Sequence, residues 1–217
     1  EQFKDVGRML EAFEHWFGPY PFYEDGYKLV EAPYLGMEHQ SSVTYGNGYQ
    51  NGYKGEDLSG TGWGLKWDFI IVHESGHEWF ANNITDKDKA DMWIHESFPN
   101  YSESLFVEYF YGKKAGAEYV IGTRERIQND SPIIADYNVN KSGSSDMYYK
   151  GGNMLHTLRQ WINDDELWRD ILRGLNKDFR STSVGDYVEV GAFRYYVANM
   201  GFTTDPVDAF GRKLKTA

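Results

Sequence analysis

Apolar residues recur at helical spacing near the start of the chain. Across residues 2–17 they return every three or four positions, which predicts a helix with one buried face. The apolar positions are Phe3, Val6, Met9, Leu10, Phe13 and Phe17. Gly18, Pro19 and Pro21 follow at once and interrupt this pattern, so we expect the helix to end beside them.

The pattern then changes along the chain. Residues 27–32 (YKLVEA) and 36–45 (GMEHQSSVTY) predict two strands. Residues 46–64 are rich in glycine and predict a loop in which tyrosine and tryptophan are the candidate anchors. Helices are predicted from about Trp67 to Asn82 and from about Met92 to Tyr111, and most of the remaining chain also has helical character.

This order of strands first and helices later predicts an α+β fold. The 217 residues fit a single domain with a sizeable core. We expect a small mixed lobe of sheet and helix over about residues 1–110, and a mainly helical lobe over about 111–217. No internal repeat is visible, and no stretch reaches the roughly 18 apolar residues of a membrane span.

Composition narrows the classes of function. Hydrophobic residues make up 41% and charged residues 25%, as in ordinary globular proteins. Lys and Arg number 22 against 33 Asp and Glu, so the net charge is −11. This balance argues against nucleic-acid binding and is compatible with cationic ligands such as the amino terminus of a peptide. The chain has no cysteine, which excludes disulfide scaffolds and thiolate metal sites. We make no prediction of where in the cell the protein is located.

The stretch VHESGHEWFANN (residues 72–83) carries the first candidate chemistry. His73 and His77 are four residues apart, so on a helix they face the same way and could chelate one zinc ion. Glu74 neighbours His73 and could reach the same pocket without being a ligand. Chance histidines on a solvated helix are the alternative interpretation of this short pattern.

Glu96 is the candidate third ligand. Eighteen residues separate it from His77, enough for the chain to turn and return on a second helix. Two histidines and one glutamate leave a fourth zinc position open, which is typical of catalytic rather than structural sites. Asp91 and Glu103 are candidates to orient the metal histidines through hydrogen bonds.

Four stretches together resemble the gluzincin zinc aminopeptidases related to aminopeptidase N and leukotriene hydrolase. Along the chain they are LGMEHQ, HESGHEWFANN, DMWIHESF and MYYKGGNMLHTLR. They lie within residues 30–160, in the order and approximate spacing of that family. Leu35, His39 and Ala81 depart from the family's usual residues. Beyond about residue 180 the resemblance is weak.

The resemblance implies a thermolysin-like catalytic domain with one zinc ion per chain, held by His73, His77 and Glu96 between the two lobes. Zinc there would polarise the scissile carbonyl and acidify a water molecule. Glu74 would act as the general base. The Tyr-x-Lys-Gly register selects Tyr148, rather than its neighbour, as the hydrogen-bond donor to the oxyanion.

The resemblance also implies a substrate-binding strand. Glu38 would bind the ammonium group of a peptide with a free amino terminus, on an edge strand able to pair with the peptide backbone. Gly36, Met37 and His39 would line this part of the site. A solvated strand glutamate and a buried or wall-forming methionine are the simpler interpretations of Glu38 and Met37.

Two other functions remain open from the sequence. One is a zinc endopeptidase, which would not need Glu38, and the other is a non-catalytic zinc-dependent binding module, which would need neither Glu74 nor Tyr148. Members of the resembled family carry a β-rich domain before this region and usually a helical domain after it. Neither is seen in this chain, so we expect the flanking domains to be partners. We expect the isolated chain to bind zinc well but to be a weak aminopeptidase or to show no measurable turnover.

Overall fold

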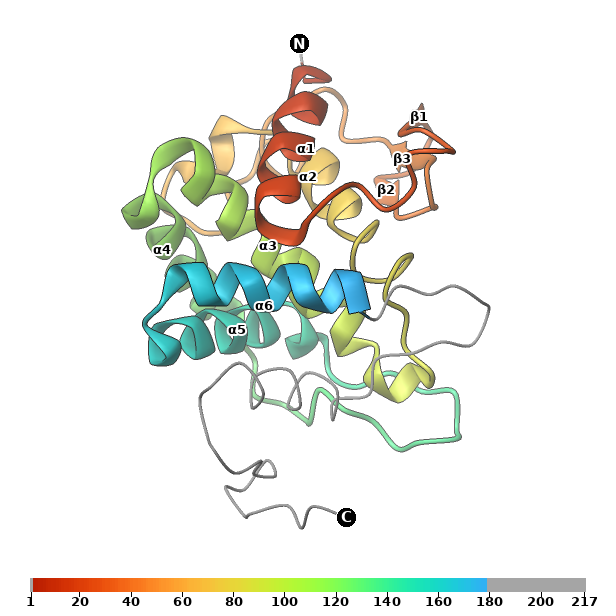
Figure 1. Ribbon diagram of the computed structural model, residues 1–217, viewed down its shortest axis with the longest axis vertical. Coiled ribbons are helices and arrows are strands. Elements are labelled where there is room, and N and C mark those ends of the chain that lie inside the picture. Colours follow the sequence, from red (N-terminus) through yellow and green to blue (C-terminus); the bar gives the residue numbers. More distant parts are fainter. Residues whose placement is uncertain (1, 179–217) are drawn as a thin grey trace.

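The computed structural model describes residues 2–178, which form a small three-stranded sheet beside a mainly helical body (Figure 1). The longer helices are α1 (Lys4–Phe17), α2 (Phe69–Gly76), α3 (Trp93–Tyr111), α4 (Lys113–Gly122), α5 (Tyr149–Ile162) and α6 (Asp165–Asp178). The short 3₁₀ helices are η1 (Trp63–Lys66), η2 (Lys89–Asp91), η3 (Thr123–Arg126) and η4 (Ser145–Met147). The α+β class is therefore confirmed, whereas the lobe boundary near residue 110 stays a prediction, as does any structure beyond residue 178, which lies outside the described residues.

The sheet consists of β1 (Leu29–Glu31), β2 (Gly36–Met37) and β3 (Val43–Tyr45). β3 is central, parallel to β1 and antiparallel to β2. The predicted single strand over residues 36–45 is wrong, because the chain reverses between β2 and β3. A turn over residues 38–42 makes this reversal, and the amide of Ser42 donates to the carbonyl of His39 at 2.9 Å.

Helix α2 is shorter than the predicted helix over residues 67–82. The Asp68 carboxylate accepts hydrogen bonds from the amides of Ile70 and Ile71, so the helix begins at Phe69. The regular helix ends at Gly76, and the chain continues in turns. In these turns the amide of Asn82 donates to the carbonyl of His77, five residues back. His77 itself keeps right-handed helical angles, so it still lies one turn after His73.

Helix α3 lies at the centre of the helical body, and glycines let its neighbours approach closely. A Cβ atom on Gly76 of α2 would lie 2.8 Å from the Ser102 hydroxyl of α3. On Gly151 of α5 it would lie 1.9 Å from the Ser97 hydroxyl of α3. Larger residues would separate these helices, so the glycines set how near α2 and α5 come to α3.

A buried network of ion pairs joins α5 to α3, α6 and α1. Arg159 of α5 is 2% exposed, and its guanidinium donates two 2.7 Å hydrogen bonds to Glu108 of α3. The same group donates to Asp165 of α6 at 2.8 Å and lies over the ring of Trp16 in α1. Because a buried guanidinium needs several partners, this network ties the four helices together.

Within residues 2–178, no helix combines the length and the apolar character that crossing a membrane requires.

Candidate metal centre and active site

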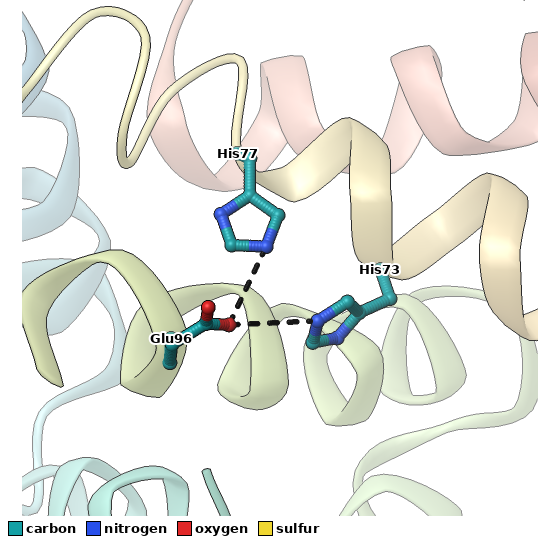
Figure 2. A group of neighbouring side chains, drawn as sticks. All are labelled: His73, His77 and Glu96. Atoms are coloured by element: carbon teal, nitrogen blue, oxygen red, sulfur yellow. Dashed lines mark ion pairs between the residues drawn. The ribbon is translucent and has the colours of Figure 1, made fainter. Parts of the chain in front are cut away.

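His73, His77 and Glu96 point toward one another between α2 and α3 (Figure 2). His73 Nε2 lies 3.8 Å from Glu96 Oε2, and His77 Nε2 lies 3.6 Å from the same oxygen. One ligand atom from each residue falls within 4.8 Å of the other two. The structure therefore brings together the three ligands predicted from the sequence.

The geometry of these three residues fits a zinc ion. Both nitrogen–oxygen distances exceed hydrogen-bonding range, but they approach the separation of about 3.3 Å expected between ligands of one tetrahedral zinc. The side chains are almost fully buried, and Glu96 Oε2 has no hydrogen-bond partner within residues 2–178. A buried carboxylate oxygen aimed at two imidazoles is explained by a shared cation.

Glu103 of α3 holds one of the two histidines. Its Oε1 lies 2.7 Å from His73 Nδ1, so the carboxylate fixes the ring and leaves Nε2 facing the metal position. Glu103 is fully buried and also accepts hydrogen bonds from Tyr119 at 2.8 Å and Asn100 at 3.3 Å. The sequence offered Glu103 as a candidate for this role, but no sequence signal identified Tyr119 or Asn100.

Asp91, the other candidate to orient the metal histidines, has different partners. Its carboxylate accepts from the Trp93 indole at 3.3 Å and from the Tyr137 hydroxyl at 3.0 Å. The prediction for Asp91 is therefore wrong, because the residue lies in η2 and its side chain secures the start of α3 and a distant loop instead.

The two histidines differ in their electrostatics. Burial opposes protonation of His73, but the hydrogen bond with Glu103 and the nearby carboxylate of Glu96 outweigh it and hold the pKa of His73 well above the ordinary value. Burial lowers the pKa of His77 to about 4, against the opposing charge of Glu96. His77 Nδ1 is buried and has no hydrogen-bond partner within the part of the chain that the structure describes.

Glu74 lies beside the metal ligands and against the sheet. A Cβ atom on Gly36 of β2 would lie 3.0 Å from Glu74 Oε1 and 2.7 Å from Ile70 Cγ2. Gly36 thus makes room for the carboxylate between α2 and β2. Burial raises the pKa of Glu74 to about 7, with the charge of His73 opposing the shift and that of Glu38 adding to it.

Tyr148 lies immediately before α5 and beside His73. Its ring stacks against that of His73 with a centroid distance of 6.2 Å. Burial raises the pKa of Tyr148, and the negative charge of Glu96 raises it further, so the phenol keeps its proton. The neighbouring Tyr149 faces another environment, where the Arg126 guanidinium lies 5.9 Å from its ring.

The predicted substrate-binding residues surround the end of β2. Gly36 and Met37 form this edge strand, and Met37 is exposed. Glu38 lies one residue beyond the strand, in the turn rather than on it, which corrects its predicted position. His39 follows and is exposed. The Glu38 carboxylate is half-buried, and it makes no hydrogen bond or ion pair with another residue of the range 2–178.

Glu38 nonetheless acts electrostatically on two groups of the site. Its carboxylate raises the pKa of both Glu74 and Tyr148. Both of those groups border the metal ligands, so the charge of Glu38 acts on the surroundings of the metal position. The structure thus gathers the metal triad, the Glu74 carboxylate against β2 and the protonated phenol of Tyr148, with Glu38 in the turn after β2.

Comparison with known proteins matches residues 2–187 to the Peptidase family M1 domain. Endoplasmic reticulum aminopeptidase 1 of Mus musculus is 25% identical over 181 residues, covering 78% of this chain and 19% of that protein. Aminopeptidase N of Lactococcus lactis subsp. lactis is 26% identical over 129 residues, covering 54% of this chain and 15% of that protein. The chain therefore spans less than a fifth of the length of these two relatives.

Solved structures agree on the fold. The M1 zinc metallopeptidase from Deinococcus radiodurans matches with a TM-score of 0.70 at 24% identity, covering 90% of this chain and 40% of that one. Leukotriene A4 hydrolase from Saccharomyces cerevisiae matches with a TM-score of 0.69 at 18% identity, covering 91% and 32%. At these identities the likeness shows a shared architecture.

Proposed function

This chain belongs to peptidase family M1, and from that premise we propose that it is the catalytic domain of a zinc aminopeptidase. The reaction is hydrolysis of the first peptide bond of a peptide with a free amino terminus. The observation that carries the proposal is the buried triad of His73, His77 and Glu96, with Glu74, Tyr148 and Glu38 placed around it.

Zinc held by the triad would supply a Lewis acid and an acidified water. Glu74 acts as the general base, taking a proton from the attacking water and delivering it to the leaving amine nitrogen. Its place against Gly36 supports this role, because β2 is where a peptide backbone would lie and the carboxylate sits directly beneath that strand. Glu74 is close to the triad without belonging to it.

Tyr148 donates a hydrogen bond to the oxygen that becomes negative when the carbonyl is attacked. Its stacking on His73 places the ring beside the metal position, and its raised pKa keeps the donor proton in place. A fixed donor of this kind stabilises the developing charge without rearranging in the reaction. The surroundings of Tyr149 support the choice between the two neighbours, since that ring packs near Arg126.

Glu38 binds the ammonium group of the substrate. Its carboxylate lacks a partner within residues 2–178 and lies close enough to influence both Glu74 and Tyr148. Gly36 and Met37 belong to an edge strand whose outer side lacks a neighbouring strand in the described sheet, so they offer backbone groups to the peptide. His39 would border the amine end of the substrate.

The activity, substrates and partners of a whole protein are part of this proposal, because the chain spans less than a fifth of two curated relatives. The partners we propose are peptides with a free amino terminus and the domains that flank this region in the longer chains of the family.

One experiment tests the proposal directly. A fluorogenic peptide with a free amino terminus is compared with its N-acetylated twin, each with and without a chelator. We expect hydrolysis of the free peptide, little hydrolysis of the acetylated one, and loss of both with chelator. Equal hydrolysis of the twins would indicate the endopeptidase instead. Tight zinc binding without hydrolysis of either peptide, also when the chain is extended through its flanking domains, would indicate the non-catalytic binding module.

A further inference from the structure

The turn that carries Glu38 is bound to the segment that follows His77. This turn, residues 38–42, joins β2 to β3. Asn82 donates from its side-chain amide to the Glu38 carbonyl at 2.8 Å. The backbone amide of Ser41 donates to Glu78 Oε1 at 2.7 Å. The turn is therefore held at both ends by residues from the short segment 78–82.

The same segment is joined to a metal ligand. Glu78 follows His77 directly in the chain, and the backbone amide of Asn82 donates to the His77 carbonyl at 2.9 Å. Each path from His77 to the turn therefore consists of a few covalent bonds and one or two hydrogen bonds. A displacement of either end would be transmitted through these contacts to the other.

Glu78 has features that a packing role alone does not explain. It is fully buried, and burial of a carboxylate is costly unless its oxygens are used. Within residues 2–178 its Oε2 lacks a hydrogen-bond partner, while its Oε1 accepts the hydrogen bond from the Ser41 amide. Burial raises the pKa of Glu78 to about 7, and the Ser41 amide, which lies in the turn, opposes this shift more than the side chains of Tyr20 and Asn82 do.

Ser41 shows why the turn needs such a contact. Its φ angle is 57°, a left-handed conformation that side chains other than glycine adopt infrequently. Such a conformation persists where neighbouring contacts hold it. The bond to Glu78 holds the amide of Ser41, and the Tyr20 hydroxyl donates to the Ser41 hydroxyl at 3.4 Å.

We propose that Glu78 and Asn82 are positioning residues for recognition of the amino terminus: they fix the 38–42 turn to the end of α2 and so set the distance between the Glu38 carboxylate and the metal. This inference rests on the proposed function, in which Glu38 binds the substrate ammonium group. It adds that selectivity for the free amine depends on two residues that do not touch the substrate.

The main test compares Glu78→Ala with Glu78→Gln. The alanine removes the acceptor for the Ser41 amide, whereas the glutamine keeps an oxygen at the same reach. We expect Glu78→Ala to lower the ratio of kcat/KM for the free peptide over its acetylated twin by about three- to ten-fold, the effect of losing one hydrogen bond. Most of this change should be in KM for the free peptide. Glu78→Gln should restore the parent ratio to within about two-fold.

Two further measurements separate positioning from damage to the metal site. Zinc content should stay at the parent level in both variants, and amide hydrogen exchange of residues 38–42 should be faster in Glu78→Ala alone. Gln40→Ala is the matched control, because Gln40 is an exposed side chain of the same turn whose contact is with Asp25. Its ratio and zinc content should equal those of the parent.

Asn82→Asp provides a second route if Glu78→Ala fails to fold. The substitution keeps the size of this half-buried side chain but replaces the donor to the Glu38 carbonyl by an acceptor. It should lower the same ratio and speed exchange of the same turn.

Two outcomes would overturn the inference: a parental ratio with parental exchange in Glu78→Ala and Asn82→Asp, or loss of zinc together with the ratio. A parent chain that treats the two peptides alike would instead overturn the proposed role of Glu38. Hydrogen exchange would still decide whether Glu78 holds the turn, since that measurement needs no turnover. Unchanged exchange in Glu78→Ala would then refute the positioning contact as well.

Discussion

The two halves of the active site are built in contrasting ways. The metal half consists of His73, His77 and Glu96, all at most 7% exposed and carried by two helices packed through Gly76. The substrate half consists of a two-residue edge strand and a turn, with Met37 42% exposed. Helix packing fixes the metal half from many sides, whereas a few hydrogen bonds fix the substrate half.

This difference separates the chemistry from the selectivity of the proposed enzyme. A buried triad keeps its ligands in place around the metal position, which the bond-breaking step requires. An exposed strand leaves room for peptides of different sequence to approach. Substitutions in the metal half should therefore affect turnover or zinc binding for every substrate, and substitutions in the substrate half should affect the choice between substrates.

The largest expected effect is that of Glu74→Gln. The amide keeps the shape of the side chain but cannot accept the proton from water, so kcat should fall by about 10²–10⁴-fold. Zinc content, measured by elemental analysis, should stay at one per chain because Glu74 is not in the triad. Turnover at near the parent rate would refute its role as general base.

Tyr148→Phe should have the next largest effect. Loss of one oxyanion donor should lower kcat by roughly 10²–10³-fold, for free and acetylated peptides alike. Tyr149→Phe is the matched control, and it should change kcat little because its ring lies near Arg126. Steady-state kinetics on both variants tests which of the two adjacent tyrosines is the oxyanion donor. The reverse order of effects would move the role to Tyr149.

Glu103→Gln tests the support of the metal half. The substitution weakens the contact that orients His73, and loss of such a partner typically lowers metal affinity by about 10–100-fold. Competition with a zinc chelator measures this affinity. Asp91→Asn is the control, since Asp91 contacts Trp93 and Tyr137, and it should bind zinc as the parent does. Equal weakening in both variants would contradict the assignment of Glu103.

Glu38→Gln should have the most selective effect. Loss of a charged hydrogen bond should lower kcat/KM for free peptides by about 10–100-fold. The acetylated twin and the zinc content should be unaffected. Glu31→Gln, at the opposite strand of the sheet, controls for the general loss of a carboxylate. If Glu38→Gln lowered the rates for both peptides equally, the division between the two halves would fail.

The sequence predicted the metal half well because its geometry is mostly local. Helical periodicity alone places His73 and His77 on one side of the chain, and a break followed by renewed helical pattern allows Glu96 to return to them. Helices α1 and α3 begin and end within two residues of their predicted bounds. Choosing Tyr148 over Tyr149, by contrast, needed the resemblance, because adjacent positions have no periodic difference that favours one.

The tertiary structure alone decided the substrate half and the supports of the metal. The reversal at residues 38–42 escaped the strand pattern, because an alternation of polar and apolar residues does not show where a chain turns back. Glu103 meets His73 across 30 residues, and Glu78 meets Ser41 across 37. Such partners depend on how helices and strands pack, and a linear pattern does not contain that information. The sequence by itself determined the metal ligands and the fold class, because these follow from local spacing and the order of elements. Packing decided which carboxylates support the metal ligands and the substrate-binding turn.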